Sequence, residues 1–153
     1  MTVTNFGCGM SNFNGAKLMI GFNLPLHLST VICIAVAEVH KSWYRSYMSW
    51  ECGLLLSGAL FCLIGYVIAG IGLAKSNHKV LLASLGIVGF GGFLVTFGLI
   101  GMAILPYDSI LIPLIIYYLT LQIWSLCLIY GAGFEAMANP VYPKDDPILL
   151  ERN

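Results

Sequence analysis

The chain has 153 residues, of which 59% are hydrophobic and only 9% are charged, and its mean hydropathy is +0.89. Soluble domains carry about 25% charged residues, so this composition excludes an ordinary soluble domain and predicts an integral membrane protein. Seven basic and seven acidic residues cancel, and the basic residues form no cluster. We therefore expect no nucleic-acid partner, because such binding needs clustered Lys and Arg to displace counterions.

Four apolar segments have about the length of twenty residues that a helix needs to cross a hydrocarbon core. They predict an all-α integral membrane protein with spans at about 18–37, 53–74, 80–105 and 110–130. Together the spans would form a four-transmembrane-helix bundle in the lipid bilayer, over residues 17–135.

The segments outside the spans are short and polar. Residues 1–16 predict a flexible arm, and residues 136–153 predict a water-soluble tail. Gly131 and Gly133, which precede that tail, are expected to end or bend the fourth helix. The short basic connection at 75–79 predicts that the second and third spans form an antiparallel hairpin.

Four spans place both chain termini on one side of the membrane. The basic residues on that side are Lys17, Lys75, Lys79, Lys144 and Arg152, and those on the other side are Lys41 and Arg45. Short loops rich in Lys and Arg stay on the cytosolic side, so both termini are predicted to be cytosolic. The connections on the opposite side are too short to form an ectodomain.

Two pairs of polar residues interrupt the apolar spans. Asn23 and His27 lie four residues apart in the first span, and Tyr118 and Gln122 lie four apart in the fourth. Residues at that spacing share one helix face, and polar groups inside a membrane usually face other helices. We therefore expect these side chains to point into the bundle. His27 has two interpretations, an interhelical hydrogen bond or a proton- or ligand-sensing group.

Small residues in the second and third spans predict close helix packing. The positions concerned are Gly65, Ala69, Gly86, Gly89 and Gly92. Glycine costs about 1 kcal/mol relative to alanine in a soluble helix, so helix propensity does not explain this density. In lipid, small residues let helix backbones approach each other, both within one chain and between the spans of different membrane proteins.

No catalytic, cofactor-binding or metal site is predicted. The five cysteines are scattered without a Cys-x-x-Cys pair, and the three histidines lie in different regions of the chain. Neither pattern predicts a disulfide framework, a zinc site or a nucleophile beside a base. We therefore expect a protein that is not an enzyme and that needs no cofactor.

The tail holds two short patterns that sorting machinery reads. One is an Asn-Pro-x-Tyr turn, and the other is an acidic residue four positions before a Leu-Leu pair. Their residues are Asn139, Pro140 and Tyr142 in the first, and Asp145, Leu149 and Leu150 in the second. In the second pattern two apolar side chains enter a groove while the carboxylate meets a basic patch. On a cytosolic tail these patterns predict binding to clathrin adaptors.

The plan of the chain resembles that of the lysosome-associated four-pass transmembrane (LAPTM-like) proteins and of related insect four-pass membrane proteins. The shared features are a start with Cys8, an entry to the first span flanked by Gly15 and Gly21, four spans, short loops and a sorting tail. The resemblance implies an endosomal or lysosomal membrane. Members of the family typically begin with clustered cysteines and end with Pro-Pro-x-Tyr motifs, whereas Asn139 stands first in the motif here, so a ubiquitin-ligase partner is not expected.

Together these features predict a non-enzymatic adaptor or trafficking partner of other membrane proteins. Endosomes or lysosomes are the expected location, and the plasma membrane is the second. Two alternatives stay open. One is a structural accessory subunit of a larger membrane complex. The other is a small channel or carrier that uses the four polar side chains of the first and fourth spans.

Overall fold

The computed structural model describes residues 11–42, 50–104 and 111–138. These residues form the four α-helices α1 (Asn12–Ser42), α2 (Trp50–Ala74), α3 (His78–Ile104) and α4 (Leu111–Ala138). Each helix contains a stretch that is long and apolar enough to cross a membrane. The prediction of an all-α chain with four helices of spanning length is therefore confirmed.

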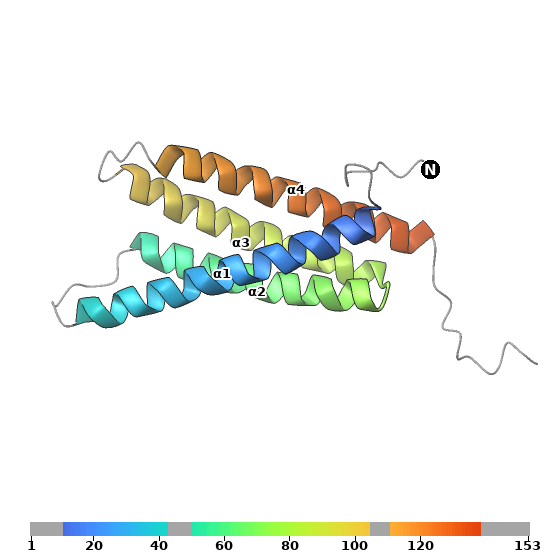
Figure 1. Cartoon of the computed structure of the whole chain (residues 1–153), viewed down its shortest axis with the longest axis horizontal. Helices are drawn as coiled ribbons and strands as arrows, with labels where there is room; N and C mark the ends of the chain where they lie inside the picture. Colours follow the sequence, from blue (N-terminus) through green and yellow to red (C-terminus); the bar gives the residue numbers. More distant parts are fainter. Residues whose placement is uncertain (1–10, 43–49, 105–110, 139–153) are drawn as a thin grey trace, which may run out of the picture.

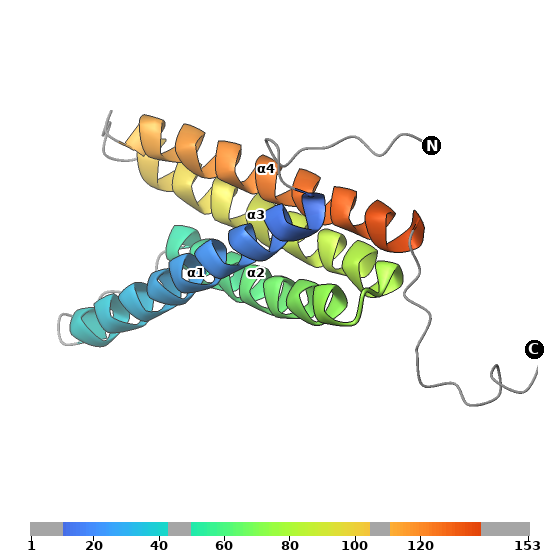
Figure 2. The same ribbon diagram turned by 45° about the vertical axis from the view of Figure 1, so that its right-hand side comes forward.

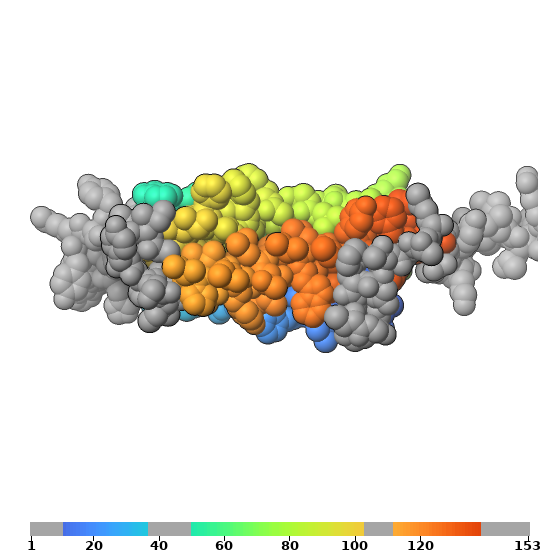
Figure 3. Space-filling model, turned by 90° about the horizontal axis from the view of Figure 1, so that it is seen from above, coloured from blue at the N-terminus to red at the C-terminus, as the bar shows by residue number. Residues whose placement is uncertain are grey.

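The helices form an up-and-down bundle in which neighbours in sequence are neighbours in space (Figure 1). The most extensive contact joins α2 to α3, while α4 packs on α3 and closes back onto α1. Figure 3 shows α3 and α4 side by side along one face of the molecule. Because the four helices alternate in direction, the start of α1 and the end of α4 lie at the same end of the bundle (Figure 2).

The contact between α2 and α3 repeats every seven residues along both helices. Glycines of α2 face large apolar residues of α3 in the antiparallel pairs Gly58–Val95, Gly65–Val88 and Gly72–Leu81. A Cβ added at Gly58 would lie 2.7 Å from Gly91 O and 2.7 Å from Val95 N, which are both backbone atoms. A seven-residue period keeps one seam facing the partner helix in left-handed packing. The side chains of α3 thus lie directly on the backbone of α2, as small-residue seams allow.

The glycines of α3 divide between an inner and an outer face. Gly91 faces α2, and Gly92 faces α4, whereas an added Cβ at Gly86 or Gly89 would meet no atom within 4 Å. Each step of three residues turns the position by about 60° around a helix, so the run 86, 89, 92 winds around α3 instead of following one contact. The Cα–Cβ direction at Gly86 and Gly89 thus points away from the other described helices, and a packing role for them stays a prediction about partners.

Two capping motifs close the hairpin between α2 and α3. Ser76 has a φ of 47°, its N bonds to Leu73 O at 3.2 Å, and Asn77 N bonds to Gly72 O at 2.9 Å. This pair of bonds is a Schellman cap, which ends α2. Asn77 then begins α3, because its Oδ1 accepts hydrogen bonds from Lys79 N (3.1 Å) and from the next amide (3.4 Å). The predicted antiparallel hairpin is confirmed.

A carboxylate of α4 caps the start of α1. Glu135 Oε1 accepts a hydrogen bond from Asn12 N (2.9 Å), and Oε2 accepts one from Phe13 N (3.2 Å). Ser11 Oγ accepts a third from Asn14 N at 3.3 Å. Three of the four amides that a helix start leaves unpaired are therefore bonded, and the negative charge lies at the positive end of the helix dipole.

These caps correct the boundary of the predicted arm. α1 begins at Asn12, although the sequence pattern predicted a flexible arm through residue 16, and it stays helical through Pro25. The polar composition of residues 1–16 hides the helix start, because the carboxylate that stabilises it is 123 residues away in the sequence.

The fourth helix also extends beyond its predicted end. It continues past Gly131 and Gly133 to Ala138. A Cβ added at Gly131 would lie 2.6 Å from Asn12 Cγ, so this glycine makes room for α1 and does not end α4. Of the two predicted outcomes, that these glycines end the helix was wrong, and that they bend it stays a prediction.

Replacing Gly58 by alanine should lower the free energy of unfolding by about 1–3 kcal/mol, because the new methyl group would strike two backbone atoms. Gly70→Ala on the same helix is the matched control, since a Cβ there meets no atom within 4 Å. We expect that control to gain up to about 1 kcal/mol from helix propensity. Denaturant unfolding in detergent micelles, followed by circular dichroism, measures both. Equal effects at the two positions would contradict the close contact of α2 and α3.

The Glu135→Gln variant should lower the free energy of unfolding by about 1 kcal/mol, because the side-chain NH2 cannot accept a hydrogen bond from either amide of α1. Amide hydrogen exchange should become several-fold faster in the first turn of α1. The first turn of α3, capped by Asn77, is the internal control and should be unchanged. Unchanged exchange at the start of α1 would contradict the assigned cap.

Candidate functional site

Polar side chains are buried between the helices, both in the middle of the bundle and near its ends. In the described ranges, the buried polar or charged side chains are Asn12, Asn23, His27, Glu51, Ser84, Gln122 and Ser125. One connected set of these, joined by two tyrosines, lies where α1, α2 and α4 meet. We call it the central polar cluster, and it consists of Asn23, His27, Tyr66, Tyr118, Gln122 and Ser125.

Gln122 of α4 is the group that links three helices. Its Oε1 accepts a hydrogen bond from the hydroxyl of Tyr66 on α2 at 3.2 Å, and its Nε2 donates to Val88 O of α3 at 3.1 Å. Gly92 makes this reach possible, since a Cβ there would lie 2.6 Å from Gln122 Nε2. The same carbonyl of Val88 accepts a weak bond from the Cys62 thiol at 3.8 Å. The amide group is therefore fully used in holding α2, α3 and α4 together.

His27 of α1 lies between two tyrosines. Its ring stacks on Tyr66, with centroids 5.7 Å apart, and meets Tyr118 edge-on at 6.0 Å. One turn earlier on the same face, Asn23 Nδ2 donates to Ser125 Oγ of α4 at 3.5 Å. His27 is 1% exposed, yet its Nε2 has no hydrogen-bond partner in the described structure.

The Tyr118 hydroxyl is a second buried group without a hydrogen bond. It lies close to the thiol of Cys62, which already donates to a backbone carbonyl, and the two do not reach ordinary hydrogen-bond geometry. Leaving a buried donor or acceptor unpaired costs about 1–3 kcal/mol, so two such atoms on neighbouring rings call for an explanation.

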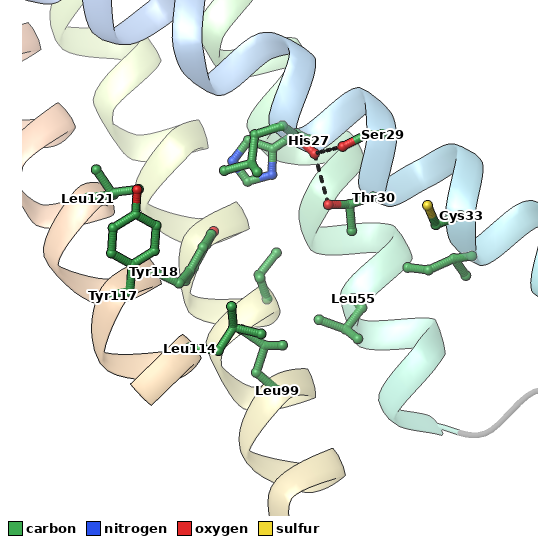
Figure 4. Close-up of a pocket in the computed structure, with 13 residues that line it drawn as sticks. His27, Ser29, Thr30, Cys33, Leu55, Leu99, Leu114, Tyr117, Tyr118 and Leu121 are labelled. Atoms are coloured by element: carbon green, nitrogen blue, oxygen red, sulfur yellow. Dashed lines mark hydrogen bonds between the residues drawn. The ribbon is translucent and has the colours of Figure 1, made fainter. Parts of the chain in front are cut away.

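His27 and Tyr118 are among the residues that line a cavity of about 350 Å³ (Figure 4), although their unpaired atoms are enclosed. Side chains of all four helices line it: His27 and Cys33 come from α1, Leu55 from α2, Leu99 from α3, and Tyr118 from α4. The walls are mostly apolar. Figure 4 shows His27 and Tyr118 near each other, with Tyr118 directing its hydroxyl toward the level of the histidine.

The side chains of the central polar cluster are suited to hydrogen bonding and to binding a ligand, and not to covalent catalysis. His27 is flanked by aromatic rings, with no described nucleophile bonded to it. Within the described ranges, no group of three or more His, Cys, Asp and Glu side chains could hold a metal ion. Glu51, a buried acid in the first turn of α2, lines neither this cavity nor a smaller one beside Lys17.

No protein-family model matches the chain, and neither a curated protein nor a solved structure shows significant similarity to it.

The four polar residues singled out by spacing lie together in one cluster. Asn23, His27 and Gln122 are buried, and Tyr118 is partly buried with an enclosed hydroxyl. Sequence reasoning missed Tyr66, which is 0% exposed, because it stands alone among apolar residues of α2. The one indication in the sequence was chemical: a tyrosine that is buried in an apolar helix usually finds a hydrogen-bond partner for its hydroxyl.

Of the predicted packing residues, Gly65 and Gly92 contact neighbouring helices and Ala69 is buried. Gly86 and Gly89 are not brought against another described helix. The tail predictions lie outside the described residues, and they concern Asn139, Pro140, Tyr142, Asp145, Leu149 and Leu150.

Replacing Tyr66 by phenylalanine should lower the free energy of unfolding by about 1 kcal/mol, because Gln122 Oε1 loses its donor while the ring packing is kept. Gln122→Leu should cost about 1–3 kcal/mol, since it removes the acceptor of the buried Tyr66 hydroxyl and the bond to Val88 O. The double variant should cost less than the sum, because both changes remove the same bond. Tyr117→Phe is the control: this residue is 58% exposed and makes no bond in the cluster. Strict additivity in micelle unfolding experiments would contradict the Tyr66–Gln122 bond.

Proposed function

We propose that the chain is a non-enzymatic four-pass membrane protein that acts as an adaptor or trafficking partner of other membrane proteins in the endosomal and lysosomal system. The observation that carries the proposal is the division of polar and apolar groups. Buried polar side chains such as Asn23, Gln122 and Ser125 are hydrogen-bonded inside the bundle. Large apolar side chains such as Leu18, Ile64 and Phe93 are exposed on its outside. Such a surface is suited to lipid and to the spans of other proteins, because lipid tails are as apolar as these side chains.

The outer face of α3 is the surface we assign to partner spans. Gly86 is exposed there, and an added Cβ at Gly86 or Gly89 would meet no atom of this chain. Exposed aromatic rings stand next to these glycines; Phe90 contacts Phe61 of α2 at 5.2 Å. Small residues beside large ones form a groove into which another helix can pack closely.

The side of the membrane is inferred from charge. Both ends of the described chain lie at the end of the bundle that holds the α2–α3 hairpin, so Lys17, Lys75 and Lys79 gather there (Figure 2). Positive residues favour the cytosol, which supports cytosolic termini and a tail that adaptors can reach. The proposed address is then the acidic dileucine pattern at residues 145–150.

An accessory subunit of a large membrane complex would use the same outer face of α3. Purification in mild detergent separates the two functions, since stable co-migration with a large assembly favours a subunit. Recovery as a small particle favours the adaptor.

Replacing Leu149 and Leu150 together by alanine should move the tagged full-length protein from endosomes and lysosomes to the plasma membrane, because adaptors would no longer hold its tail. Asp145→Ala should produce a partial shift in the same direction. Ile148→Ala is the matched control, since it removes a neighbouring apolar side chain without touching the motif. Surface biotinylation and microscopy measure the shift. An unchanged distribution of the double variant would overturn the sorting proposal.

A further inference from the structure

The smaller cavity beside Lys17 is a cleft between α1 and α2, at the end of the bundle that holds the α2–α3 hairpin. Its volume is about 270 Å³. At this end Glu135 joins the start of α1 to α4, and both ribbon views show α1 leaning toward α4 (Figures 1 and 2). The cleft therefore lies on the side from which α1 has turned away. The residues that line it are Lys17 and Ile20 of α1 and Gly70, Leu73 and Ala74 of α2.

Small residues of α2 keep the cleft open, and apolar side chains form its floor. A Cβ added at Gly70 would meet no atom within 4 Å, and Ala74, one turn later on the same face, contributes only a methyl group. Ile20 and Leu73 are 7% and 3% exposed. The cleft is thus suited to an apolar chain that packs along it.

Lys17 is the one charged residue among the described lining residues of the cleft. Its side chain is exposed, and its Nζ lies 5.2 Å from the ring centroid of Phe13, one turn nearer the start of α1. A lysine near a helix end extends its ammonium group in this way toward water while its stem lies on apolar surface. The ring occupies one side of an ammonium group that has three N–H donors. A cation therefore stands at the rim of an apolar cleft.

Positive charge exceeds negative charge at this end of the described helices. Lys75 directly follows α2, and Lys79 lies in the first turn of α3. Glu38 and Glu51 lie toward the opposite end of the bundle, and Glu135 already accepts two hydrogen bonds from the start of α1. Together with the lysine at the rim, these side chains favour a ligand of net negative charge over a zwitterion.

The cleft stands at the level of lipid headgroups when the bundle is inserted in a membrane. α2 has 25 residues, so at 1.5 Å per residue it is about 37 Å long. The hydrocarbon core of a bilayer is about 30 Å thick, so the ends of α2 reach the headgroup region. Leu73 and Ala74 belong to that end. Basic pockets between spans on the cytosolic side bind anionic headgroups.

From these observations we propose that the cleft binds an anionic phospholipid, for which phosphatidylserine is the probe. The Lys17 ammonium group bonds to the phosphate at the rim, and one acyl chain enters the cleft over Ile20 and Leu73. At about 30 Å³ for each non-hydrogen atom, taken from the volume of a water molecule, the cleft holds roughly nine atoms, the first part of such a chain. The proposal rests on the membrane insertion that we propose above and is independent of the tail.

The test uses the full-length protein in phosphatidylcholine nanodiscs and a phosphatidylserine probe that carries a photoreactive diazirine near the start of one acyl chain. We expect crosslinks to map to residues 17–21 of α1 or 70–75 of α2. Unlabelled phosphatidylserine should reduce this labelling about fivefold or more, whereas added phosphatidylcholine or inorganic phosphate should not. Equal competition by phosphatidylcholine would show ordinary surrounding lipid, and competition by inorganic phosphate would show a site for a soluble anion. Either result would overturn the proposal.

Two matched pairs of variants separate the cleft from the general lipid surface. Lys17→Gln should reduce labelling about fivefold, while Lys41→Gln, near the opposite end of α1, should leave it unchanged. Gly70→Leu should fill the cleft and reduce labelling by a similar factor. Gly53→Leu is its control, because a Cβ at either glycine meets no atom within 4 Å, yet Gly53 lies at the other end of α2. If either pair behaves alike, the assigned cleft is wrong.

The outcomes also separate this proposal from the proposed function. Labelling of the outer faces without preference for the cleft would overturn the lipid site alone. The absence of a crosslink to any helix would contradict membrane insertion, and with it both proposals. Selective labelling of the cleft, in a protein whose location is unchanged by the Leu149→Ala and Leu150→Ala substitutions, would support the lipid site while the sorting proposal fails.

Discussion

Hydrogen bonds between side chains of different helices are the constraint on which the middle of this bundle depends. The Gln122 amide is buried among apolar residues, where each unpaired polar atom would cost about 1–3 kcal/mol. Its two bonds, to Tyr66 and to Val88 O, fix α4 against α2 and α3 in one register. A shift of α4 by one turn would break both bonds and leave the buried Gln122 amide and the Tyr66 hydroxyl without these partners. Apolar packing alone would not distinguish these registers, because every face of these helices is rich in apolar side chains.

The glycines and the polar bonds belong to one arrangement. Val88, whose carbonyl receives the Gln122 amide, also packs its side chain against the backbone at Gly65. Gly92, one turn further along α3, leaves the space through which the amide passes. Without these two glycines the helices would stand too far apart for a side chain of one to reach the backbone of another. Close packing is therefore the condition for pairing the polar groups.

Much of the fold could be predicted from the sequence, because helix length, apolar runs and a four-residue spacing are local properties. The four helices, the hairpin at Asn77 and the inward direction of His27 and Gln122 all follow from such patterns. The cap of α1 by Glu135 could not be predicted, since it depends on a contact 123 residues away. Gly91 contacts α2 and Gly86 does not, because of the side that α3 turns toward α2. The spacing of the glycines alone does not determine that side.

The candidate site could be predicted only in part for the same reason. The spacing of Tyr118 and Gln122 places both on one face of α4, yet their environments differ. Gln122 lies where the four helices are close and is fully bonded, whereas Tyr118 lies one turn nearer the end where α1 has moved away. The two environments differ because the Glu135 cap holds one end of α1 against α4, while the other end of α1 diverges from α4. Proteins that satisfy nearly all their polar groups tend to leave exceptions at functional sites. Here the exceptions at His27 and Tyr118 are two neighbouring rings in edge contact, whose unpaired atoms are enclosed by the packing around them, while the third, at Glu51 Oε1, lies in the first turn of α2.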